Sequence, residues 1–327
     1  MAVASNTVNI STVVGARESL ADKRYMIEPT ATPVLTAMGG MGKAKAFYEE
    51  WLPVSLNSAN KDNAAIDGDD APANSTPSSA TRVGNRIQLS FKIASVAEGQ
   101  NQVSVAGDQN KMKTELVDKA IELRRDMEQA VLSNNPSVAM TSSAAGKSAG
   151  FQAWLTSNVS RGASGANGGF SGGIVAAATN GTNRVLTYAL VTGVMQTRFT
   201  ASGNARTSLM AVMPPSVKTT YWSTFTGLSI NRVENQNSKL GATVQQSIDI
   251  ILTDFGQLQA IPHAYAFATG QKCVVIVDPS NAEVLSFSGI NQEKLAKSGF
   301  ADRQKLDVYW TLKVNNEKAH GIVTDIT

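Results

Sequence analysis

The sequence is poor in the side chains on which most catalytic and metal sites depend. It has one cysteine, Cys273, and two histidines, His263 and His320, among 327 residues. A single cysteine forms no intramolecular disulfide, and no His/Cys cluster has the spacing of an ordinary metal site. Cys273 lies in the apolar run KCVVIV, which indicates a buried and inert thiol. We therefore expect no catalytic residue, no cofactor and no metal ligand.

Charge and long apolar runs are also scarce. Charged residues make up 17% of the chain and the net charge is +3, which is too small a basic excess for tight nucleic-acid binding. No window approaches the roughly 18 consecutive apolar residues of a membrane span. The N-terminal stretch MAVASNTVNISTVVG lacks the basic and apolar regions of a secretory signal. We expect a soluble protein that is made inside the cell and has no membrane partner.

Three short motifs resemble functional sites but lack what those sites require. AMGGMGKAK at 37–45 has no Ser or Thr after its lysine, so a glycine hinge is expected there instead of a phosphate-binding loop. DFG at 254–256 has no accompanying kinase motifs and is expected to be a turn between strands. A solvated loop tip, with weak divalent-ion binding as the alternative, is expected for Asp67, Asp69 and Asp70.

The strongest pattern is an amphipathic helix expected over residues 108–133. Its apolar residues recur at steps of three and four, at Met112, Leu116, Ala120, Leu123, Met127 and Ala130, and Val117, Ile121 and Val131 widen this stripe. Asp108 is the expected N-cap, and the helix is expected to stop at 134–136. Its predicted ion pairs are Glu115 with Lys119 and Arg124 with Glu128. Such a helix is roughly 39 Å long, which suits a strut in an extended molecule.

Two strands are expected before this helix, at 46–56 and 82–96. In the second strand Ile87, Leu89, Phe91 and Ile93 alternate with polar residues. The segment between the strands has Ile66 as its only large apolar residue. Because so long a structureless loop is unusual in a compact domain, a projecting two-stranded arm is expected. An isolated hairpin is marginally stable in water, so its apolar face implies a partner surface.

The remaining segments predict an arm and a mixed body. The arm covers 1–38, with helical turns at 19–26 that Pro29 and Pro33 end. A flexible Gly/Ser-rich loop is expected at 160–173. Helices are expected at 183–200, after Pro214-Pro215, and at 292–297. Strands are expected at 208–213, 244–252, 256–264 and 272–279, with Ile250 and Leu252 on one face. A last strand is expected at 306–314, where Leu306, Val308, Trp310, Leu312 and Val314 share a face.

In this order, the elements resemble the major capsid protein of tailed bacteriophages, of the Hong Kong 97-like fold and the podophage type. The stretches that carry the resemblance are KTELVDKAIELRRDMEQAVLSN, DFGQLQAIP and EKLAKSGFADRQKLDVYWTLKVNNEKAHGIV. The resemblance implies an α+β fold with an N-terminal arm (1–38), an extended β-hairpin loop (39–100), a peripheral domain sheet (101–160 and 295–316) with the long spine helix 108–133, and an axial domain (161–294 and 317–327).

The resemblance also implies a function and a set of partners. Copies of the chain would associate as hexamers and pentamers into an icosahedral head around double-stranded DNA, assembled in the host cytoplasm and located in the virion. Partners would be the chain itself, separate scaffolding and portal proteins, cement proteins as a further candidate, and packaged DNA through weak non-specific contact. Candidate inter-subunit contacts are Tyr48, Trp51, Ile87, Leu89, Phe91, Glu115, Lys119, Arg124 and Arg125.

Covalent assembly is not expected. Some relatives crosslink a lysine of the extended loop to a neighbour's asparagine, and Lys61 lies in the corresponding loop. No catalytic carboxylate for that reaction is identifiable, so a non-covalent shell is expected.

Three other classes of protein remain as alternatives. A β-rich filament or surface-layer subunit would be favoured by a secretion signal. A hydrolase of unknown type would need Cys273 or a histidine at its centre, and no Gly-x-Ser-x-Gly elbow supports it. A nucleic-acid-binding module would need a basic patch.

Overall fold

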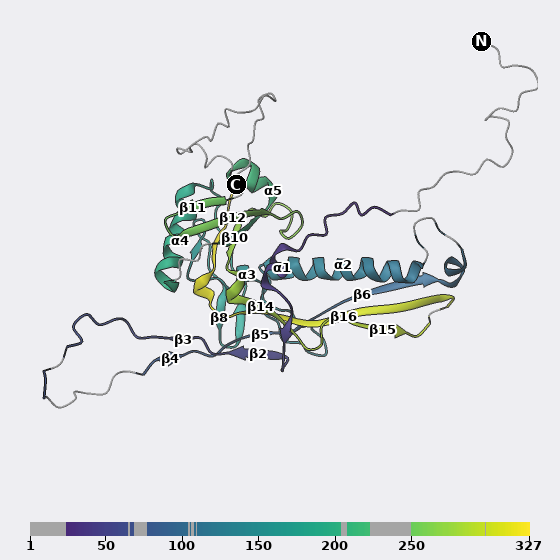
Figure 1. The fold of residues 1–327 in the computed structure, drawn as a ribbon, viewed down its shortest axis with the longest axis horizontal. Coiled ribbons are helices and arrows are strands. Elements are labelled where there is room, and N and C mark those ends of the chain that lie inside the picture. The colour runs from purple at the N-terminus through teal and green to yellow at the C-terminus, as the bar shows by residue number, and fades with distance from the viewer. Residues whose placement is uncertain are drawn as a thin grey trace, which may run out of the picture.

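The molecule has a central body from which a strand-and-helix lobe and a thin hairpin project in opposite directions (Figure 1). The computed structural model describes residues 24–64, 66–68, 77–103, 105, 108, 110–203, 208–222, 250–297 and 299–327. Most expected elements are present, and several of their boundaries and phases differ from those predicted.

The expected long helix is α2 (Lys111–Leu132), which is about 33 Å long. Its N-cap is Asn110, whose side chain accepts a hydrogen bond from the Lys113 amide at 3.1 Å. The prediction of Asp108 as N-cap was therefore wrong. The Asp108 carboxylate instead accepts from the Thr114 hydroxyl and pairs with the Lys111 ammonium at 3.2 Å, so it still lies close to the start of the helix, where a negative charge is stabilising.

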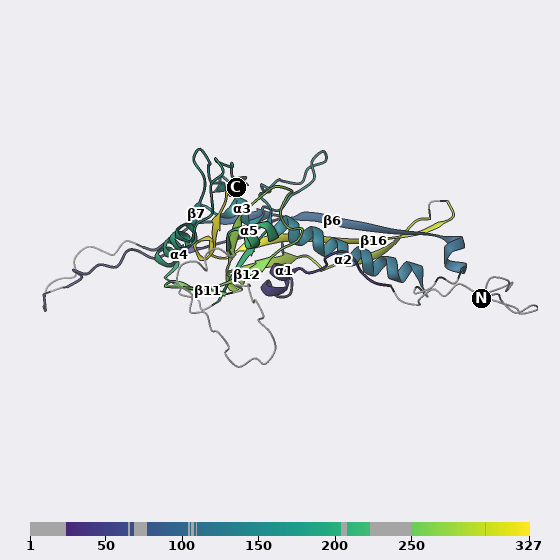
Figure 2. The same ribbon diagram turned by 90° about the horizontal axis from the view of Figure 1, so that it is seen from above.

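Helix α2 packs on strands β6 and β16 of the first sheet (Figure 2). The central strand is β16 (Ala301–Val314), with β6 (Gln88–Ala97) on one side and β15 (Asn291–Leu295) on the other. Nearer the body β16 pairs with β14 (Ala282–Ser286), which pairs with β1 (Gly42–Lys43). The expected phase of β16 is confirmed, because all five residues of its predicted apolar face are buried: Leu306, Val308, Trp310, Leu312 and Val314.

Strand β15 replaces the short helix expected at 292–297, so that prediction was wrong. The segment pairs antiparallel with β16, and the Lys305 ammonium lies 2.8 Å from the Glu293 carboxylate across the two strands. Polar residues such as these are typical of an exposed edge strand. Pairing with a partner distant in sequence thus overrode the local preference for helix.

The strand expected over 82–96 is divided at Ile87. The first part, β5 (Val83–Arg86), pairs with β2 (Tyr48–Trp51) in the hairpin, while β6 pairs with β16. At the junction the Ile87 amide donates to the Phe47 carbonyl at 3.0 Å. In β6 the small residues Ala94 and Val96 are buried, whereas Leu89 and Phe91 are exposed.

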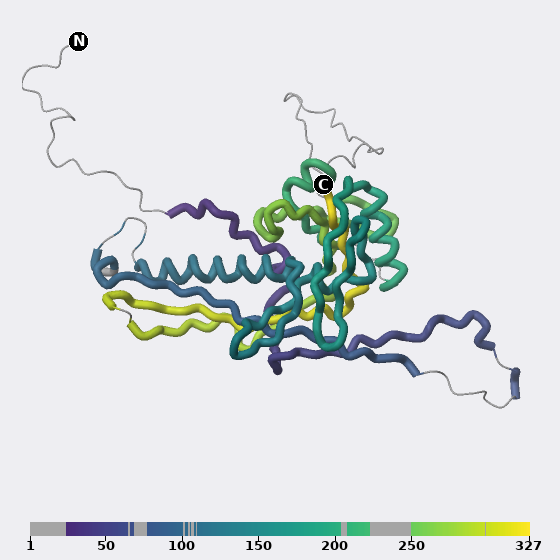
Figure 3. Tube along the Cα trace, turned by 180° about the vertical axis from the view of Figure 1, so that it is seen from behind, coloured from purple at the N-terminus to yellow at the C-terminus, as the bar shows by residue number. Residues whose placement is uncertain are grey.

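The expected projecting hairpin is confirmed. Beyond β2 and β5 it continues as β3 (Val54–Ser55) paired with β4 (Ser79–Ala80), and it extends well away from the body (Figures 1 and 3). The strand expected at 46–56 is interrupted between β2 and β3 by Leu52 and Pro53, consistent with proline lacking an amide for strand pairing.

The second sheet forms the core of the body. Its order is β11 (Ile250–Thr253), β12 (Gly256–Pro262), β10 (Leu209–Met213), β13 (Val274–Val277), β17 (Gly321–Val323) and β7 (Val159–Ser160). Strands β10 and β13 are buried along their whole length, as expected for 208–213 and 272–279. The DFG segment is the expected turn, and Gly256 supplies a φ of 129° there. These strands lie between the two projections (Figure 1).

Two predictions were wrong: which face of β11 points to the core, and where helix α4 begins. Ile250 and Leu252 are 50% and 76% exposed, whereas Ile251 packs against the core, so β11 has the opposite phase to the expected one. The rest of the strand expected at 244–252 lies outside the described residues. Helix α4 (Tyr188–Ser202) begins later than the expected residue 183 and ends at Gly203, which is left-handed with φ 64°. Its buried side chains are Val191, Val194, Met195 and Arg198.

Short elements complete the fold. Helix α1 (Pro33–Met38) begins at the proline that was expected to end a helix, because proline is favoured at the first helical position. The turns expected at 19–26 lie mostly outside the described residues. The segment expected as a flexible loop contains β8 (Gly169–Ser171), paired with β9 (Ile174–Ala176). Further elements are α3 (Phe151–Trp154), α5 (Pro215–Thr220), η1 (Glu98–Gln102), η3 (Pro279–Asn281) and η4 (Glu317–Ala319).

Sheet membership differs from the expected domain boundaries. Strands β14 and β15 fall within 161–294 or at its border, yet both pair with β16 in the first sheet. Strand β7 falls within 101–160, yet it pairs with β17 in the second sheet. The junction between the sheets is filled by a shared core that includes Met127 of α2 and Trp310 of β16.

Candidate contact surfaces

The single cysteine and both histidines are buried in the core. Burial raises the pKa of the Cys273 thiol above its usual range and lowers that of His320 to about 4. The His320 Nδ1 accepts from the Asp278 amide at 3.1 Å. Across the described part of the chain, no group of three or more His, Cys, Asp or Glu side chains could hold a metal ion. None of the described helices is both long enough and apolar enough to cross a membrane.

One buried carboxylate, that of Glu128, joins three parts of the fold. It accepts hydrogen bonds from the amides of Val34 at 2.9 Å and Leu35 at 2.8 Å, in the first turn of α1. The His263 Nε2, beyond the end of β12, lies 3.2 Å from the same carboxylate. Because the His263 Nδ1 accepts from the Ala266 amide, its proton is on Nε2. The predicted pair of Arg124 with Glu128 was therefore wrong, since Glu128 points into the protein.

The chain before α1 lies along α2 (Figure 3). The Arg24 guanidinium pairs with Asp118 of α2 at 2.5 Å and lies 3.7 Å from the Asp108 carboxylate. Nearer α1, the Tyr265 hydroxyl donates to the Ala31 carbonyl at 2.7 Å. Exposed apolar side chains follow Arg24 in this strap: Tyr25, Met26 and Ile27.

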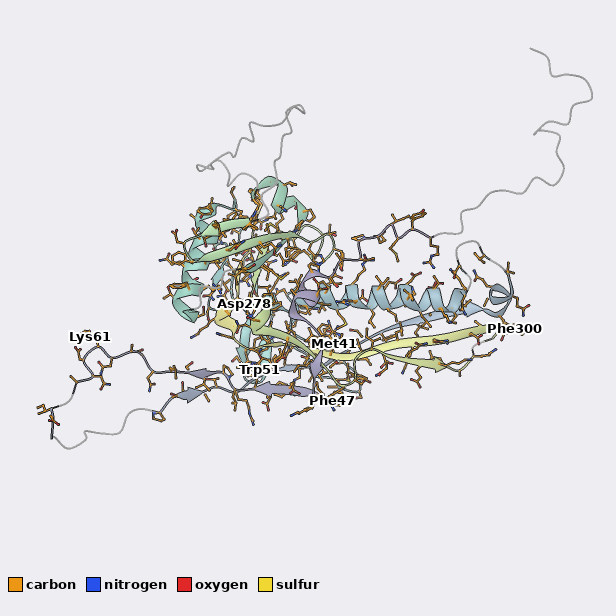
Figure 4. The ribbon with its side chains drawn as sticks, viewed as in Figure 1. Met41, Phe47, Trp51, Lys61, Asp278 and Phe300 are labelled. Carbon is orange, nitrogen blue, oxygen red and sulfur yellow. The ribbon has the colours of Figure 1, made fainter. Side chains whose placement is uncertain are left out.

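The projecting hairpin is anchored at its root and apolar beyond it. The Trp51 indole donates to the Val314 carbonyl at 2.9 Å and packs 5.4 Å from the Trp154 ring. Past this anchor Leu52, Val54 and Leu56 occupy alternate positions of the hairpin and are 62%, 61% and 83% exposed. Val54 lies in β3, and Leu52 and Leu56 flank that strand. These three, called here the hairpin ridge, place apolar surface on the stretch of the projecting hairpin between Trp51 and Lys61 (Figure 4).

An aromatic patch covers the sheet face opposite α2. Phe47 packs edge-on against Phe287 at 5.3 Å and Tyr309 at 6.3 Å. Leu89 lies opposite Tyr309 in the strand register, and Phe91 follows two residues later on the same face. Phe47 and Phe91 remain 59% and 58% exposed.

A groove of about 230 Å³ lies between α1, α2, strand β14 and the segment that follows β14. Its lining is apolar apart from one charge, Arg124, and consists of Leu35, Gly39, Gly40, Met41, Arg124, Met127, Val284 and Ile290. Leu35, Met127 and Val284 are buried, whereas Met41 and Ile290 are 39% and 42% exposed. Buried core residues therefore form the bottom of the groove, and exposed apolar residues form its edge.

The predicted contact residues have different environments. Leu89 and Phe91 are exposed, whereas Ile87 is buried and unavailable to a neighbour. Tyr48 and Trp51 are half-buried at the hairpin root, and the Arg86 guanidinium stacks 4.1 Å from the Tyr48 ring.

On α2 the predicted pair is confirmed, with the Lys119 ammonium 3.7 Å from the Glu115 carboxylate and 2.8 Å from that of Glu122. The Arg124 guanidinium donates to the Thr36 hydroxyl, and that of Arg125 stacks on the Tyr265 ring. The prediction missed the hairpin ridge, although its alternation is visible in the sequence. It also missed Met41 and Ile290, which come together only in the fold.

Comparison with known proteins gives one family and a set of similar structures. The family described as SU10 major capsid protein matches residues 3–327. No curated protein matches the chain. The capsid protein of cyanophage A-1(L) superimposes with a TM-score of 0.59 at 12% identity, covering 98% of each chain.

Two further structures share the fold. The capsid of a native GTA particle gives a TM-score of 0.57 at 11% identity over 99% of this chain and 100% of that one. The SrpI encapsulin of Synechococcus elongatus gives 0.55 at 9% identity over 95% and 92%. At these identities each likeness shows the fold alone.

Proposed function

The chain belongs to the SU10 major capsid protein family, and from that premise we propose how it builds a shell. It is a structural protein of an icosahedral phage capsid, with the expected Hong Kong 97-like fold. Copies associate as hexamers and pentamers around double-stranded DNA, and the hairpin of each copy reaches over a neighbour.

The hairpin ridge is the observation that carries this proposal. Leu52, Val54 and Leu56 are exposed on a hairpin that projects from the body. Solvent-exposed apolar side chains on an isolated two-stranded hairpin bring no stability to a lone subunit, and a contiguous apolar patch is typical of an interaction surface. A neighbouring copy that covers the ridge would remove this apolar surface from water.

Several weak surfaces acting together suit a shell. The ridge, the aromatic patch and the strap at Tyr25–Ile27 lie on different parts of the molecule, so one subunit can engage several neighbours. In a closed assembly these contacts act at once, and their combined affinity greatly exceeds that of each alone. Contacts between unlike surfaces close into rings when the rotation permits.

The partners and location follow from the same role. Separate scaffolding and portal proteins direct assembly in the host cytoplasm, cement proteins are a further candidate, and the finished protein resides in the virion. The small net charge of +3 supports weak, non-specific contact with packaged DNA.

The shell is proposed to be non-covalent and the chain to have no enzymatic role. Lys61 is exposed on the hairpin, and its ammonium lies 2.7 Å from the carboxylate of the adjacent Asp62, which is also exposed. An exposed carboxylate in water is a poor site for activating a lysine, which needs desolvation to become a nucleophile. Mature particles should therefore run as a single band on a denaturing gel, and a ladder of multimers would refute non-covalent assembly.

Deleting residues 52–81, which include the hairpin ridge, with a short Gly-Ser connection in their place, tests the role of the hairpin. The β2–β5 pairing and the body stay intact, so the isolated variant should have the wild-type circular dichroism spectrum and melting temperature. Sedimentation velocity and negative-stain images should show no closed shells under conditions in which the wild type forms them. Normal particles from this deletion would contradict the proposed role.

A further inference from the structure

The hairpin leaves the first sheet at a junction of buried polar side chains, called here the root junction: Asn85, Ser148 and Thr311. We infer that the root junction sets the direction of the hairpin, with Asn85 as its central positioning residue, and thereby the geometry in which one copy meets the next. This inference rests on the proposed shell-building function and adds to it the part of the fold that aims the hairpin.

Strands β6 and β16 stop pairing where the hairpin begins. Their last paired residues are Gln88 and Trp310. Continuing this register by two residues places Arg86 opposite Leu312, and the backbone groups of an antiparallel strand face a given neighbour at every second residue. If these two residues paired, β5 would continue along β16 and the hairpin would lie beside that strand.

Side chains instead bind all four backbone groups of these two residues. The Leu312 amide donates to the Ser148 hydroxyl at 3.0 Å, and the Leu312 carbonyl accepts from the Asn85 Nδ2 at 2.8 Å. The Arg86 amide donates to the Asn85 Oδ1 at 2.9 Å, and the Arg86 carbonyl accepts from the Thr311 hydroxyl at 2.9 Å. The two strands therefore separate in the protein interior without leaving any of these groups unpaired.

Asparagine is the side chain that fits the centre of the root junction. The Asn85 Nδ2 also donates to the Ser148 hydroxyl at 3.1 Å and to the Ala149 carbonyl at 3.3 Å. Its Oδ1 accepts from the Ala149 amide at 3.0 Å as well. An asparagine amide supplies both donors and an acceptor, whereas an ionised aspartate of the same shape supplies acceptors only. A buried network in which every member has a partner specifies one arrangement of the chain.

The chain at 146–149 packs against the point where β5 ends and β6 begins. A Cβ atom added at Gly146 would lie 2.7 Å from the Ile87 carbonyl oxygen, so the two backbones approach closely there. The Ser148 amide donates to the Gln88 side-chain oxygen at 3.2 Å. Ile87 itself is buried in a cluster of apolar side chains. Both the backbone and the side chain at the bend are therefore held in place.

The length of the hairpin magnifies any change of angle at its root. The Trp51 indole fixes one of its strands by the hydrogen bond to the Val314 carbonyl, and the root junction fixes the other. A stretch of about ten residues, such as that from Trp51 to Lys61, spans at most about 33 Å, so a rotation of about 10° at the root displaces its end by about 6 Å. Apolar side chains are in contact only within about 4.5 Å. A closed shell therefore depends on the direction that the root junction sets.

Distances within the unassembled, full-length subunit test the role of the root junction. Nitroxide labels at Ser55→Cys, exposed on β3, and Val185→Cys, exposed on the body, report the direction of the hairpin by double electron–electron resonance. The native Cys273 is buried with a raised pKa, so the introduced cysteines are the ones labelled. We expect one narrow distance distribution in the otherwise wild-type chain. In Asn85→Asp, where a carboxylate faces two carbonyl oxygens, we expect a broadened or shifted one.

Asn158→Asp is the matched control. Asn158 is also a buried asparagine, and its Nδ2 donates at 2.8 Å to the carbonyls of Lys318 and His320, in the body of the protein. This variant should lose stability in the same way as Asn85→Asp, while its distance distribution stays narrow. Ser148→Ala removes the acceptor of one buried amide and introduces no charge. It should also broaden the distribution, and it replaces Asn85→Asp should that variant fail to fold.

Assembly gives the second readout. Under conditions in which the wild type and Asn158→Asp form regular shells, folded Asn85→Asp or Ser148→Ala subunits should give misshapen particles or none in negative-stain images. Regular shells from subunits with changed distances would contradict the inferred effect on assembly. Narrow, unshifted distances in both junction variants, or equal broadening in Asn158→Asp, would overturn the inference and leave the proposed function standing. Failure of the wild-type chain to form shells with its scaffolding partner would instead overturn the proposed function, whereas the distances would still test the root junction.

Discussion

Replacing Glu128 with glutamine should loosen the attachment of the arm. The carboxylate accepts from the amides of Val34 and Leu35 and from the His263 Nε2, through two oxygens that both act only as acceptors. A glutamine has one oxygen and one NH2 group, so in either orientation at least one of these donors faces another donor. A buried donor left without an acceptor costs about 1–3 kcal/mol. We expect the free energy of unfolding of Glu128→Gln to fall by that amount.

Hydrogen exchange distinguishes a local effect from a global one. The amides of Val34 and Leu35 should exchange faster in Glu128→Gln than in the wild type, and Glu128→Ala, which leaves all three donors without an acceptor, should lose at least as much stability as Glu128→Gln. Glu122→Gln is the matched control on the same helix. Its carboxylate pairs with Lys119 near the surface, so less than about 1 kcal/mol should be lost. Unchanged stability and unchanged exchange at both amides in Glu128→Gln would refute the reasoning.

Three further predictions concern the core. Trp310→Asp should abolish folding, because Trp310 is fully buried and a charge there is left unpaired; soluble, native-like protein on gel filtration would contradict the assigned face of β16. His320, whose pKa is lowered to about 4, stays neutral in the folded state while the unfolded state binds a proton below about 6.5. The contribution of neutral His320 to stability is therefore complete above about pH 6.5 and falls toward pH 4. In urea unfolding the free energy of unfolding should be about 2 kcal/mol lower at pH 5 than at neutral pH. The same dependence of stability on pH in His320→Gln would contradict this assignment. Gly162→Ala should destabilise by about 1–3 kcal/mol or more, because its Cβ would lie 1.9 Å from the Thr182 carbonyl oxygen; Gly193→Ala meets nothing within 4 Å and should be neutral or stabilising in thermal melts.

The sequence predicted best the elements whose pattern is strong over many residues. The long helix and the face of β16 follow from apolar residues that repeat at the helical and strand periods. The projecting hairpin was inferred from a segment too polar to be packed in a compact domain. These features depend on the local chain alone, so no tertiary information was needed.

The errors come from contacts between distant segments. The segment 291–295 is polar enough to suit a helix or an edge strand, and its pairing with β16 decides for the strand. Glu128 falls among charged neighbours in the sequence, and only the approach of α1 and His263 makes it a buried acceptor. In β11 the neighbouring positions 250, 251 and 252 are all apolar, so their alternation gives no phase.

The candidate contact surfaces illustrate a more general difficulty. An apolar residue that faces a neighbouring subunit has the same pattern in the sequence as one that faces the protein's own core. In β16 the alternating apolar face is buried against α2, whereas in β6 the alternating residues Leu89 and Phe91 lie on the solvent face. Only the fold separates the two cases, because it shows which faces the chain itself already covers. For a protein that forms a shell, the apolar residues left exposed by a complete fold are therefore the first places to look for its neighbours, and the hairpin ridge and the groove are two such places on one chain.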